Sequence, residues 1–402
     1  MVISHHSIAI IHHSSAITPS LYLHVPFCIR RCLYCDFYIL PLGDGPPSKR
    51  LQEFRSLKHH RFLQALDAEL ASLPDDFKPR TVYLGGGTPT EIPPEQLENL
   101  FSSLEKHVDL SDVTEFSCEA NPGTLDARMA DLLVSKGVTR VSLGVQSFSD
   151  PMLQALGRIH DKADAFESVK TLRKAGVKNL SIDLLFALPN TQGQDLNLNL
   201  SAIEELQPEH VSWYSLEFEK GTAFTDMRDK GFLKEPDENE TEAEYHGIRT
   251  GLSQLGFEHY ELFSFTKPGY ESRHNINYWQ GGDYLGVGPS AHSHLNGKRW
   301  SNLPDLTAYI LKHCDGKGGC ISEAEALDDH AKARETLMTQ LRVVKGVDKT
   351  SFYHQSGFTI EDLLGSSLKV WQDAGWVTQT NQTLRLLPDA YLISDSLFRE
   401  FV

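Results

Sequence analysis

Three cysteines lie within ten residues near the start of the chain, in the stretch "CIRRCLYCDF". Cys28, Cys32 and Cys35 follow an apolar run that begins at Leu21, so we expect them on one loop. Thiolates at this Cys-x3-Cys-x2-Cys spacing are able to share one metal assembly, and soft sulfur ligands favour zinc or an iron–sulfur cluster. Structural zinc is commonly bound by two separated pairs of ligands, and no second pair of cysteines follows here.

A four-iron cluster held by three cysteines leaves one iron without a protein ligand. The amine and carboxylate of an amino-acid head group can chelate such an iron, so the array predicts a cluster with an open site for a small molecule. The alternative is three packed structural thiols without a metal. We interpret the other, scattered cysteines of this chain as structural thiols without a metal. They are Cys118, Cys314 and Cys320.

Glycines and acidic residues follow other apolar runs. In "GGGTPT", residues 85–87 allow the backbone to approach a ligand closely, although glycines at the end of a strand are as often simple turns. The stretch fits neither GxGxxG nor a P-loop, so phosphate binding is not indicated. Glu119 and Asp183 are predicted at strand ends on one face of a sheet, where α/β barrels place their sites. Helix capping is the alternative for both carboxylates.

Apolar runs and amphipathic segments alternate about six times before residue 220. Between the runs lie helical patterns such as residues 62–70 and 97–104, which favour a parallel sheet with right-handed crossovers. Six such units form either an open sheet or an incomplete barrel, and periodicity does not distinguish them. The six predicted strands begin at Leu21, Thr81, Thr114, Thr139, Asn179 and His210.

The C-terminal part has a different pattern. Two helical stretches, residues 328–344 and 359–375, precede "WVTQTNQTLRLL", which we interpret as a hairpin turning near Asn381. Helices followed by a hairpin predict a small winged-helix-like domain. Such domains often bind nucleic acid, but this one lies in an acidic chain, which favours a structural role.

Composition sets limits on partners and location. The chain has 402 residues, a formal net charge of −16 and six cysteines. The negative charge argues against a nucleic-acid partner, and no run approaches the roughly 20 apolar residues that span a bilayer. Sparse cysteines are typical of a reducing cytoplasm. Residues 1–19 are interpreted as a flexible leader, in which His5, His6, His12 and His13 are taken as incidental.

The motifs resemble a known family. "CIRRCLYC" is similar to the signature of the radical S-adenosylmethionine (SAM) superfamily. Together with "LYLHVPFC", "GGGTPT", "EANPGT", "GVQSF", "LGRIH", "DLLFALP" and "RHNINYW", it resembles the oxygen-independent coproporphyrinogen III oxidase family over nearly the whole chain after the leader. The resemblance implies an α/β fold, an incomplete (β/α)6 TIM-like barrel with a C-terminal helical, winged-helix-like domain. We expect the barrel at 20–235, an extension at 236–302 and the C-terminal domain at 303–402.

The resemblance also implies cofactors and the residues that bind them. It assigns a 4Fe-4S cluster to Cys28, Cys32 and Cys35, and radical chemistry that begins with reductive cleavage of SAM. The methionyl part of SAM is expected against Gly86, Gly87 and Thr88. Further residues that match SAM contacts of the family are Tyr22, Tyr34, Glu119, Gln146, Arg158 and Asp183. For the two tyrosines, core packing is an equally good interpretation.

One departure from the family pattern bears on function. In the decarboxylating oxidases a further cysteine stands two residues after the third, and here that residue is Phe37. "CDF" together with "RHNINYW" resembles instead the branch regarded as heme chaperones. His274 then becomes the expected heme-associated residue, with the aromatic rings of Tyr278 and Trp279 beside the macrocycle. His292 and His294 are alternative ligands. The alternative interpretation, without heme, is that His274 and Asn275 are hydrogen-bonded loop residues.

Three hypotheses follow. The preferred one is a heme chaperone that binds heme, a 4Fe-4S cluster and SAM, and transfers heme to acceptor hemoproteins. The second is coproporphyrinogen III oxidase activity, which the residue at position 37 disfavours. The third is another radical enzyme with a large substrate. No catalytic residue is assigned, and peripheral docking on a membrane is compatible with all three.

Overall fold

The computed structural model describes residues 19–44, 48–189, 195–316 and 321–399. Nearly all of the predicted leader, including its four histidines, lies outside these residues. Within them, no helix is both long and apolar enough to cross a membrane.

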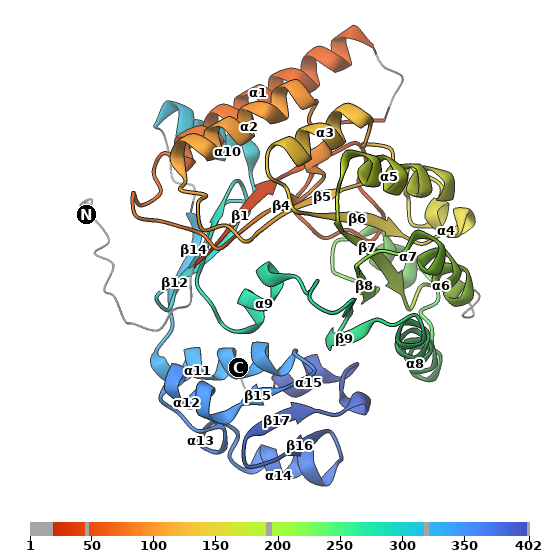
Figure 1. Ribbon diagram of the computed structural model, residues 1–402, viewed down its shortest axis with the longest axis vertical. Coiled ribbons are helices and arrows are strands. Elements are labelled where there is room, and N and C mark those ends of the chain that lie inside the picture. The colour runs from red at the N-terminus through yellow and green to blue at the C-terminus, as the bar shows by residue number, and fades with distance from the viewer. Residues whose placement is uncertain (1–18, 45–47, 190–194, 317–320, 400–402) are drawn as a thin grey trace.

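Six parallel strands form the centre of the molecule, and they coincide with the six predicted from the sequence (Figure 1). Helices cross over between successive strands on the outer side. The strands are β1 (Ser20–Val25), β4 (Thr81–Gly86), β5 (Glu115–Ala120), β6 (Arg140–Gln146), β7 (Asn179–Phe186) and β8 (His210–Ser215). The covering helices are α1 (Lys49–Leu70), α2 (Pro94–His107), α3 (Ala127–Ser135), α4 (Asp150–Ala155), α5 (Lys162–Ala175) and α6 (Asp195–Leu206).

The two faces of this sheet differ in chemistry because successive strand residues point to opposite sides. On the outer face, apolar side chains such as Leu23 and Leu143 are fully buried in one core with helix residues such as Leu100. The inner face carries polar side chains at alternate positions, for example Ser142 next to Glu119 and Ser212 next to Asp183. The interior of the barrel is therefore lined by groups that can bind a polar ligand.

Additional strands extend both edges of the sheet without closing it. On one edge β11 (Tyr284–Val287) is parallel to β1, followed by β12 (His292–Leu295), β13 (Lys298–Asn302) and β14 (Ile321–Ala326); on the other lie β10 (Ser264–Thr266) and β9 (Glu258–Glu261). Within the described residues, the edge strands β14 and β9 are not paired with each other. The predicted incomplete barrel is confirmed. The helices α7 (Ala223–Asp229), α8 (Glu238–Gln254) and α10 (Leu306–Asp315) complete this part.

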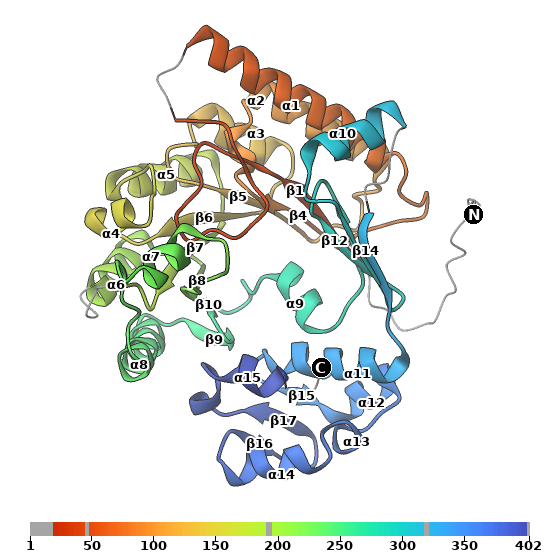
Figure 2. The ribbon, with the colours of Figure 1, turned by 180° about the vertical axis from the view of Figure 1, so that it is seen from behind.

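A short helix, α9 (Arg273–Trp279), lies on the concave side of the sheet, between the strands and the C-terminal domain (Figure 2). Its first turn is held by the buried Glu115 at the start of β5, whose carboxylate accepts hydrogen bonds from the backbone N–H groups of Arg273 (3.0 Å) and His274 (3.1 Å). A carboxylate at a helix N-terminus satisfies free N–H groups and interacts favourably with the helix dipole. Glu115 therefore fixes where α9 sits.

The C-terminal domain consists of helices followed by a hairpin, as predicted. Its elements are α11 (Asp329–Leu341), β15 (Val347–Asp348), α12 (Lys349–Ser356), α13 (Ile360–Leu364), α14 (Ser366–Asp373), β16 (Val377–Gln379), β17 (Thr383–Leu386) and α15 (Ser394–Arg399). Strands β15, β17 and β16 form a separate sheet. We placed the domain boundary at residue 302 from the sequence, but α10 and β14 still belong to the layers of the large sheet, and the helices of the smaller domain begin at α11.

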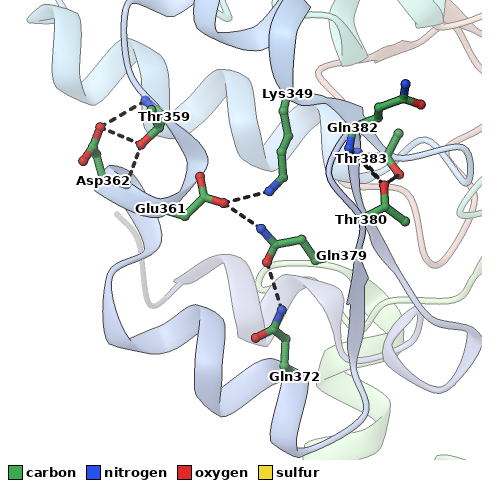
Figure 3. A network of polar contacts seen from close by, with 9 residues as sticks. All are labelled: Lys349, Thr359, Glu361, Asp362, Gln372, Gln379, Thr380, Gln382 and Thr383. Atoms are coloured by element: carbon green, nitrogen blue, oxygen red, sulfur yellow. Dashed lines mark hydrogen bonds and ion pairs between the residues drawn. The ribbon is translucent and has the colours of Figure 1, made fainter.

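A polar network ties the helices of this domain to its hairpin (Figure 3). Oε1 of Glu361 accepts hydrogen bonds from Nζ of Lys349 (2.7 Å) and from Nε2 of Gln379 (2.6 Å), and Oε1 of Gln379 accepts one from Gln372 (2.9 Å). These four side chains come from α12, α13, α14 and β16. Because Glu361 and Gln372 are exposed and the other two are half-buried, the network orients the elements more than it stabilises them, and the domain has buried Trp371 and Phe352 in its core.

Candidate functional site

The cysteine loop leaves the end of β1 and returns through two short strands, β2 (Phe27–Cys28) and β3 (Leu40–Pro41), which pair with each other. Its shape is set by Arg31, whose guanidinium donates hydrogen bonds of 3.0 Å to the backbone carbonyls of Cys35, Phe37 and Ile39. A planar guanidinium can hold several acceptors at once. Arg31 therefore shapes the loop through its backbone carbonyls.

All three cysteines of the loop line one cavity of about 430 Å³ inside the barrel. Burial raises the pKa of the Cys28 thiol to about 12 and that of Cys35 to about 11. Among the described residues, no three His, Cys, Asp or Glu side chains lie close enough together to hold a single metal ion. The thiols fit a polynuclear cluster better than one zinc ion, because each thiolate of a cluster binds a different iron.

Two carboxylates face the same cavity, and neutral groups hold both of them. Glu119 accepts hydrogen bonds from the Tyr83 hydroxyl (2.8 Å) and from the N–H of Gly86 (3.0 Å). Burial raises the pKa of Glu119 to about 7, the two hydrogen bonds oppose the rise, and the nearby Asp183 adds to it. The pKa of Glu119 thus lies well above the usual range of a carboxyl group, close to neutral pH.

Asp183 is held in the same way by serine hydroxyl groups. Ser142 donates to Oδ2 (2.8 Å) and Ser181 to Oδ1 (3.1 Å). Burial raises the pKa of Asp183, although the hydroxyl donors lower it. The residue lies in the middle of β7 rather than at its end, so it points into the barrel from deeper than the sequence suggested.

The guanidinium of Arg158 is buried beside the cysteines. It donates to the Cys32 sulfur (3.3 Å), to Oδ1 of Asn121 (2.5 Å) and to the backbone carbonyl of Gly144 (2.5 Å), while its Nε is buried without a hydrogen-bond partner in the described chain. Asn121 in turn donates to Oγ1 of Thr88 (2.6 Å), which lies 3.4 Å from the Cys28 sulfur. One hydrogen-bonded chain therefore runs from Arg158 to the first cysteine.

Gln146 reaches the cavity through an irregularity of the sheet. The register between β6 and β7 shifts between Gly144 and Gln146, and Gln146 has φ of +72°, a left-handed conformation that is rare for a residue with a side chain. A bulge turns the side chains that follow it. Here it directs Gln146 into the cavity at the end of its strand.

The glycines after β4 make room for protein neighbours. A Cβ at Gly87 would stand 2.5 Å from the carbonyl oxygen of Phe27, and one at Gly86 would collide with the His24 ring. The N–H groups of Gly87 and Thr88 donate to the carbonyls of Val25 (2.9 Å) and Phe27 (2.7 Å). The glycines thus seat the end of β4 against the start of the cysteine loop, whereas the sequence suggested room for a ligand.

The structure brings most of the predicted residues together. Eleven line the first cavity, namely Cys28, Cys32, Tyr34, Cys35, Gly86, Gly87, Thr88, Glu119, Gln146, Arg158 and Asp183. Tyr22 lines a second cavity instead, and its hydroxyl lies 3.0 Å from Nδ1 of His24. His274 lines neither of these two cavities; it is buried in α9 between them.

Both ring nitrogens of His274 are occupied by hydrogen bonds. Nδ1 lies 2.8 Å from Oγ1 of Thr81, and Nε2 lies 2.8 Å from the Tyr278 hydroxyl. Because the Thr81 hydroxyl donates to Ser20, Nδ1 of His274 is the donor in its pair, and Nε2 accepts from Tyr278. Burial lowers the pKa of His274 to about 3, so the ring is neutral.

Sequence reasoning missed the residues that support this site. Tyr83 and Ser142 hold the carboxylates, Asn121 connects Arg158 to Thr88, and Arg31 shapes the loop. The alternation of polar and apolar residues along the strands was a usable signal for Tyr83 and Ser142. No comparable signal existed for Arg31, because its acceptors are backbone carbonyls.

Comparison with known proteins identifies the family. A heme chaperone HemW of Lactococcus lactis is 33% identical over 392 residues, covering 95% of this chain and 97% of that protein. The chain belongs to the HemW family of the radical SAM superfamily. A second HemW, from Bacillus subtilis, is 31% identical over 95% of this chain and 99% of its own length.

Family models and one solved structure agree with this membership. The model of the radical SAM superfamily matches residues 22–198, and that of the HemN C-terminal domain matches residues 327–393. The structure of coproporphyrinogen III oxidase (HemN) from Escherichia coli, described as a radical SAM enzyme, superimposes with a TM-score of 0.80 over 96% of this chain and 90% of that one. At 22% identity this likeness shows a shared fold. The predicted family and fold class are both confirmed.

Because Gly86 lies directly against the His24 ring, replacing it with alanine should measurably lower the free energy of unfolding. Gly86 (φ +101°) and Gly176 at the end of α5 (φ +99°) have nearly the same φ, but a Cβ at Gly176 would meet no atom within 4 Å. We expect Gly176→Ala to lower the free energy of unfolding by about 1 kcal/mol, from strain alone. Gly86→Ala should cost about 2 kcal/mol more because the His24 ring must move. Equal losses in urea unfolding would contradict the seating role.

The raised pKa of Glu119 predicts how stability depends on pH. Between pH 4.5 and 7 the unfolded state releases this proton while the folded state keeps it, so Glu119 makes stability fall as pH rises through that window, by on the order of 3 kcal/mol. In ligand-free protein, Glu119→Gln should remove this slope. Urea unfolding at pH 5 and pH 7.5 measures it, and Glu98→Gln on the exposed side of α2 should leave the slope as it is. An unchanged slope in Glu119→Gln would show that Glu119 is ionised throughout.

Proposed function

We propose that this protein is a heme chaperone, which binds heme, one 4Fe-4S cluster and SAM, and transfers heme to acceptor hemoproteins. Family membership supports the proposal, since relatives that match over nearly their whole length are named heme chaperones. The observation that carries it within this chain is Phe37, which is 63% exposed and lines both cavities. The resemblance places a cysteine at this position in the oxidases, so the present loop offers three thiols to a cluster and an apolar ring to a second ligand.

The first cavity is the proposed site of the cluster and of SAM. Cys28, Cys32 and Cys35 would hold the cluster, which supplies an electron for reductive cleavage of SAM when both are bound. The lining suits a zwitterionic ligand because it contains both signs of charge. The Arg158 guanidinium suits a carboxylate, and the carboxylates suit an amine or hydroxyl groups.

Individual contacts to SAM follow from the donors and acceptors present. Asp183 is a suitable acceptor for ribose hydroxyls, and Gly86, Gly87 and Thr88 border the cysteines where the methionyl part belongs. Glu119 would be ionised by an ammonium group placed beside it, since an adjacent cation favours the charged form of a carboxylate. Tyr34 and Gln146 are further proposed contacts. Tyr22 lines the second cavity and not the first, so its proposed role in SAM binding is indirect, through the wall between the two cavities.

His274 is proposed to support heme binding. Coordination of iron by Nε2 of His274 requires loss of the hydrogen bond from Tyr278, and coordination by Nδ1 requires loss of the one to Thr81. Both bonds are buried, so either loss leaves a polar group without a partner. His274 is therefore better placed to orient Tyr278 than to bind iron directly.

Oxidative decarboxylation of coproporphyrinogen III is the alternative function. Its support is the shared fold with HemN, and the absence of a cysteine at position 37 weighs against it.

We also propose a cytoplasmic location and hemoproteins as acceptors, with peripheral docking on a membrane where an acceptor is membrane-bound. Nucleic acid is not a proposed partner, given the net charge of −16.

Replacing one loop cysteine tests the cluster assignment. Cys32→Ala should lower the iron bound after anaerobic reconstitution and weaken the cluster absorbance, because one of three ligands is lost. Cys314→Ala removes an exposed cysteine outside the cavity and serves as the matched control. Iron content equal to that of the wild type in Cys32→Ala would refute the assignment.

One reaction distinguishes the two functions. Reconstituted protein is incubated anaerobically with reductant, SAM and coproporphyrinogen III, and protoporphyrinogen and 5'-deoxyadenosine are measured together. A chaperone is expected to form no porphyrin product, and heme-loaded protein should pass heme to an apo-hemoprotein. Repeated turnover to protoporphyrinogen would instead establish oxidase activity. The phenylalanine at position 37 would then no longer count against that activity.

A further inference from the structure

A second cavity, of about 590 Å³, lies between the barrel and the C-terminal domain. Its walls come from the inner face of β1, β11 and β12, from the end of α9, from residues 36–38 of the cysteine loop and from α11. Its volume falls within the range of about 300–1,000 Å³ that is usual for small-molecule sites, and such sites often lie between domains. Gly86, Glu119, Asp36 and Phe37 line both cavities.

The lining of the second cavity suits a flat aromatic ligand. Six aromatic side chains face it, namely those of Tyr22, Phe37, Tyr38, Tyr278, Trp279 and Tyr284. Buried aromatic rings bind other ring systems by stacking and edge contacts. Nε1 of Trp279 is buried without a hydrogen-bond partner in the described chain, so this wall also retains an unused donor.

Three histidines line this cavity, and they differ in what their rings are free to do. His24 donates from Nε2 to the carbonyl of Tyr38 (2.8 Å) and accepts at Nδ1 from Tyr22 (3.0 Å), so both nitrogens are engaged. His294 is 6% exposed, and its Nε2 is buried without a partner in the described chain. His292 is exposed and stands two residues along the same face of β12. Of the three, only His292 is solvent-exposed, whereas the unpartnered Nε2 of His294 is enclosed by protein.

The opposite wall, on α11, carries charge. Lys332 and Glu335 from this helix line the cavity across from the strands. A lysine ammonium at the border of an aromatic cavity suits the carboxylates of an otherwise apolar ligand. An imidazole on one side, aromatic rings around it and a cation at the border together match an iron porphyrin that carries propionates.

His274 connects the two cavities through ring contacts. The Glu119 carboxylate in the first cavity accepts from the Tyr83 hydroxyl, the Tyr83 ring stacks on His274 with a centroid distance of 5.0 Å, and His274 accepts from Tyr278 in the second cavity. His274 thus fixes the orientation of one aromatic wall residue. Its effect on a ligand in the second cavity is exerted through Tyr278.

We propose that the second cavity is the heme site, with His292 as the axial ligand of the iron, Lys332 as a partner of the propionates and His274 as a positioning residue that orients Tyr278. This inference rests on the proposed chaperone function and adds to it the location of the heme and a separate role for each histidine.

The test is a titration of the full-length protein with ferric heme, followed by the Soret band and by electron paramagnetic resonance. The leader histidines offer imidazoles of their own, so every variant is built on a background in which His5, His6, His12 and His13 are replaced by Ala. His292→Ala should shift the Soret band and change the resonance, and added imidazole should restore the original spectrum. His246→Ala, which removes an exposed histidine on α8, is the matched control and should titrate like the background.

His274→Ala should behave differently from His292→Ala. We expect its heme affinity to fall about tenfold with the Soret position unchanged, as for the loss of a residue that orients a ligand contact. Tyr278→Phe, which removes the same hydrogen bond, should reproduce the loss, and the double variant should be no weaker than His274→Ala. Thr339→Trp fills the cavity from α11 and should abolish binding.

The outcomes separate this inference from the function on which it rests. If neither the wild type nor the background protein binds heme, the chaperone proposal fails. If only the wild type binds heme, the leader histidines hold it, and the inference is wrong although the chaperone function stands. If it binds heme and His292→Ala keeps the spectrum while His274→Ala changes it, the axial ligand is His274 and the inference is wrong. If Thr339→Trp binds heme like the background, the ligand lies outside the second cavity, and the inference is wrong although the chaperone function stands.

Discussion

The barrel interior is governed by the requirement that a buried carboxylate be hydrogen-bonded. Asp183 and Glu119 are held by hydroxyl groups and a backbone amide, and among the described residues neither forms a direct ion pair with a buried cation. Neutral donors position a carboxylate without neutralising it, so its capacity to attract a cation remains. Arg158 is likewise held by a sulfur, an amide oxygen and a carbonyl. Buried groups of both signs therefore stay available to a ligand.

Much of this fold follows from periodicity. The six central strands and the C-terminal hairpin were predicted because apolar alternation and turn residues are local signals. The large sheet extends to β14 because strands after α9 pair with β1 and with one another, and such long-range pairing leaves little trace in sequence. This is why the boundary drawn at residue 302 missed α10 and β14.

The sequence predicted which residues would lie close together better than it predicted how each of them is held. Spacing alone brought the cysteines together, since they share one short loop. The second cavity, which Tyr22 faces, depends on how α9 and α11 pack against the sheet, and no local pattern encodes that packing. Likewise, the engaged nitrogens of His274 depend on Thr81, which is 193 residues away in the chain.

Phe37 and Glu119 belong to a wall with a cavity on each side, and each cavity is a proposed ligand site. An occupant of the first cavity that ionises Glu119 or displaces the Phe37 ring alters the surface offered to an occupant of the second. Thermodynamic linkage makes this influence mutual: the factor by which one ligand changes the affinity for the other is the same in both directions. In the proposed two-site arrangement, a partition of so few residues would couple the binding of the two molecules, whichever binds first.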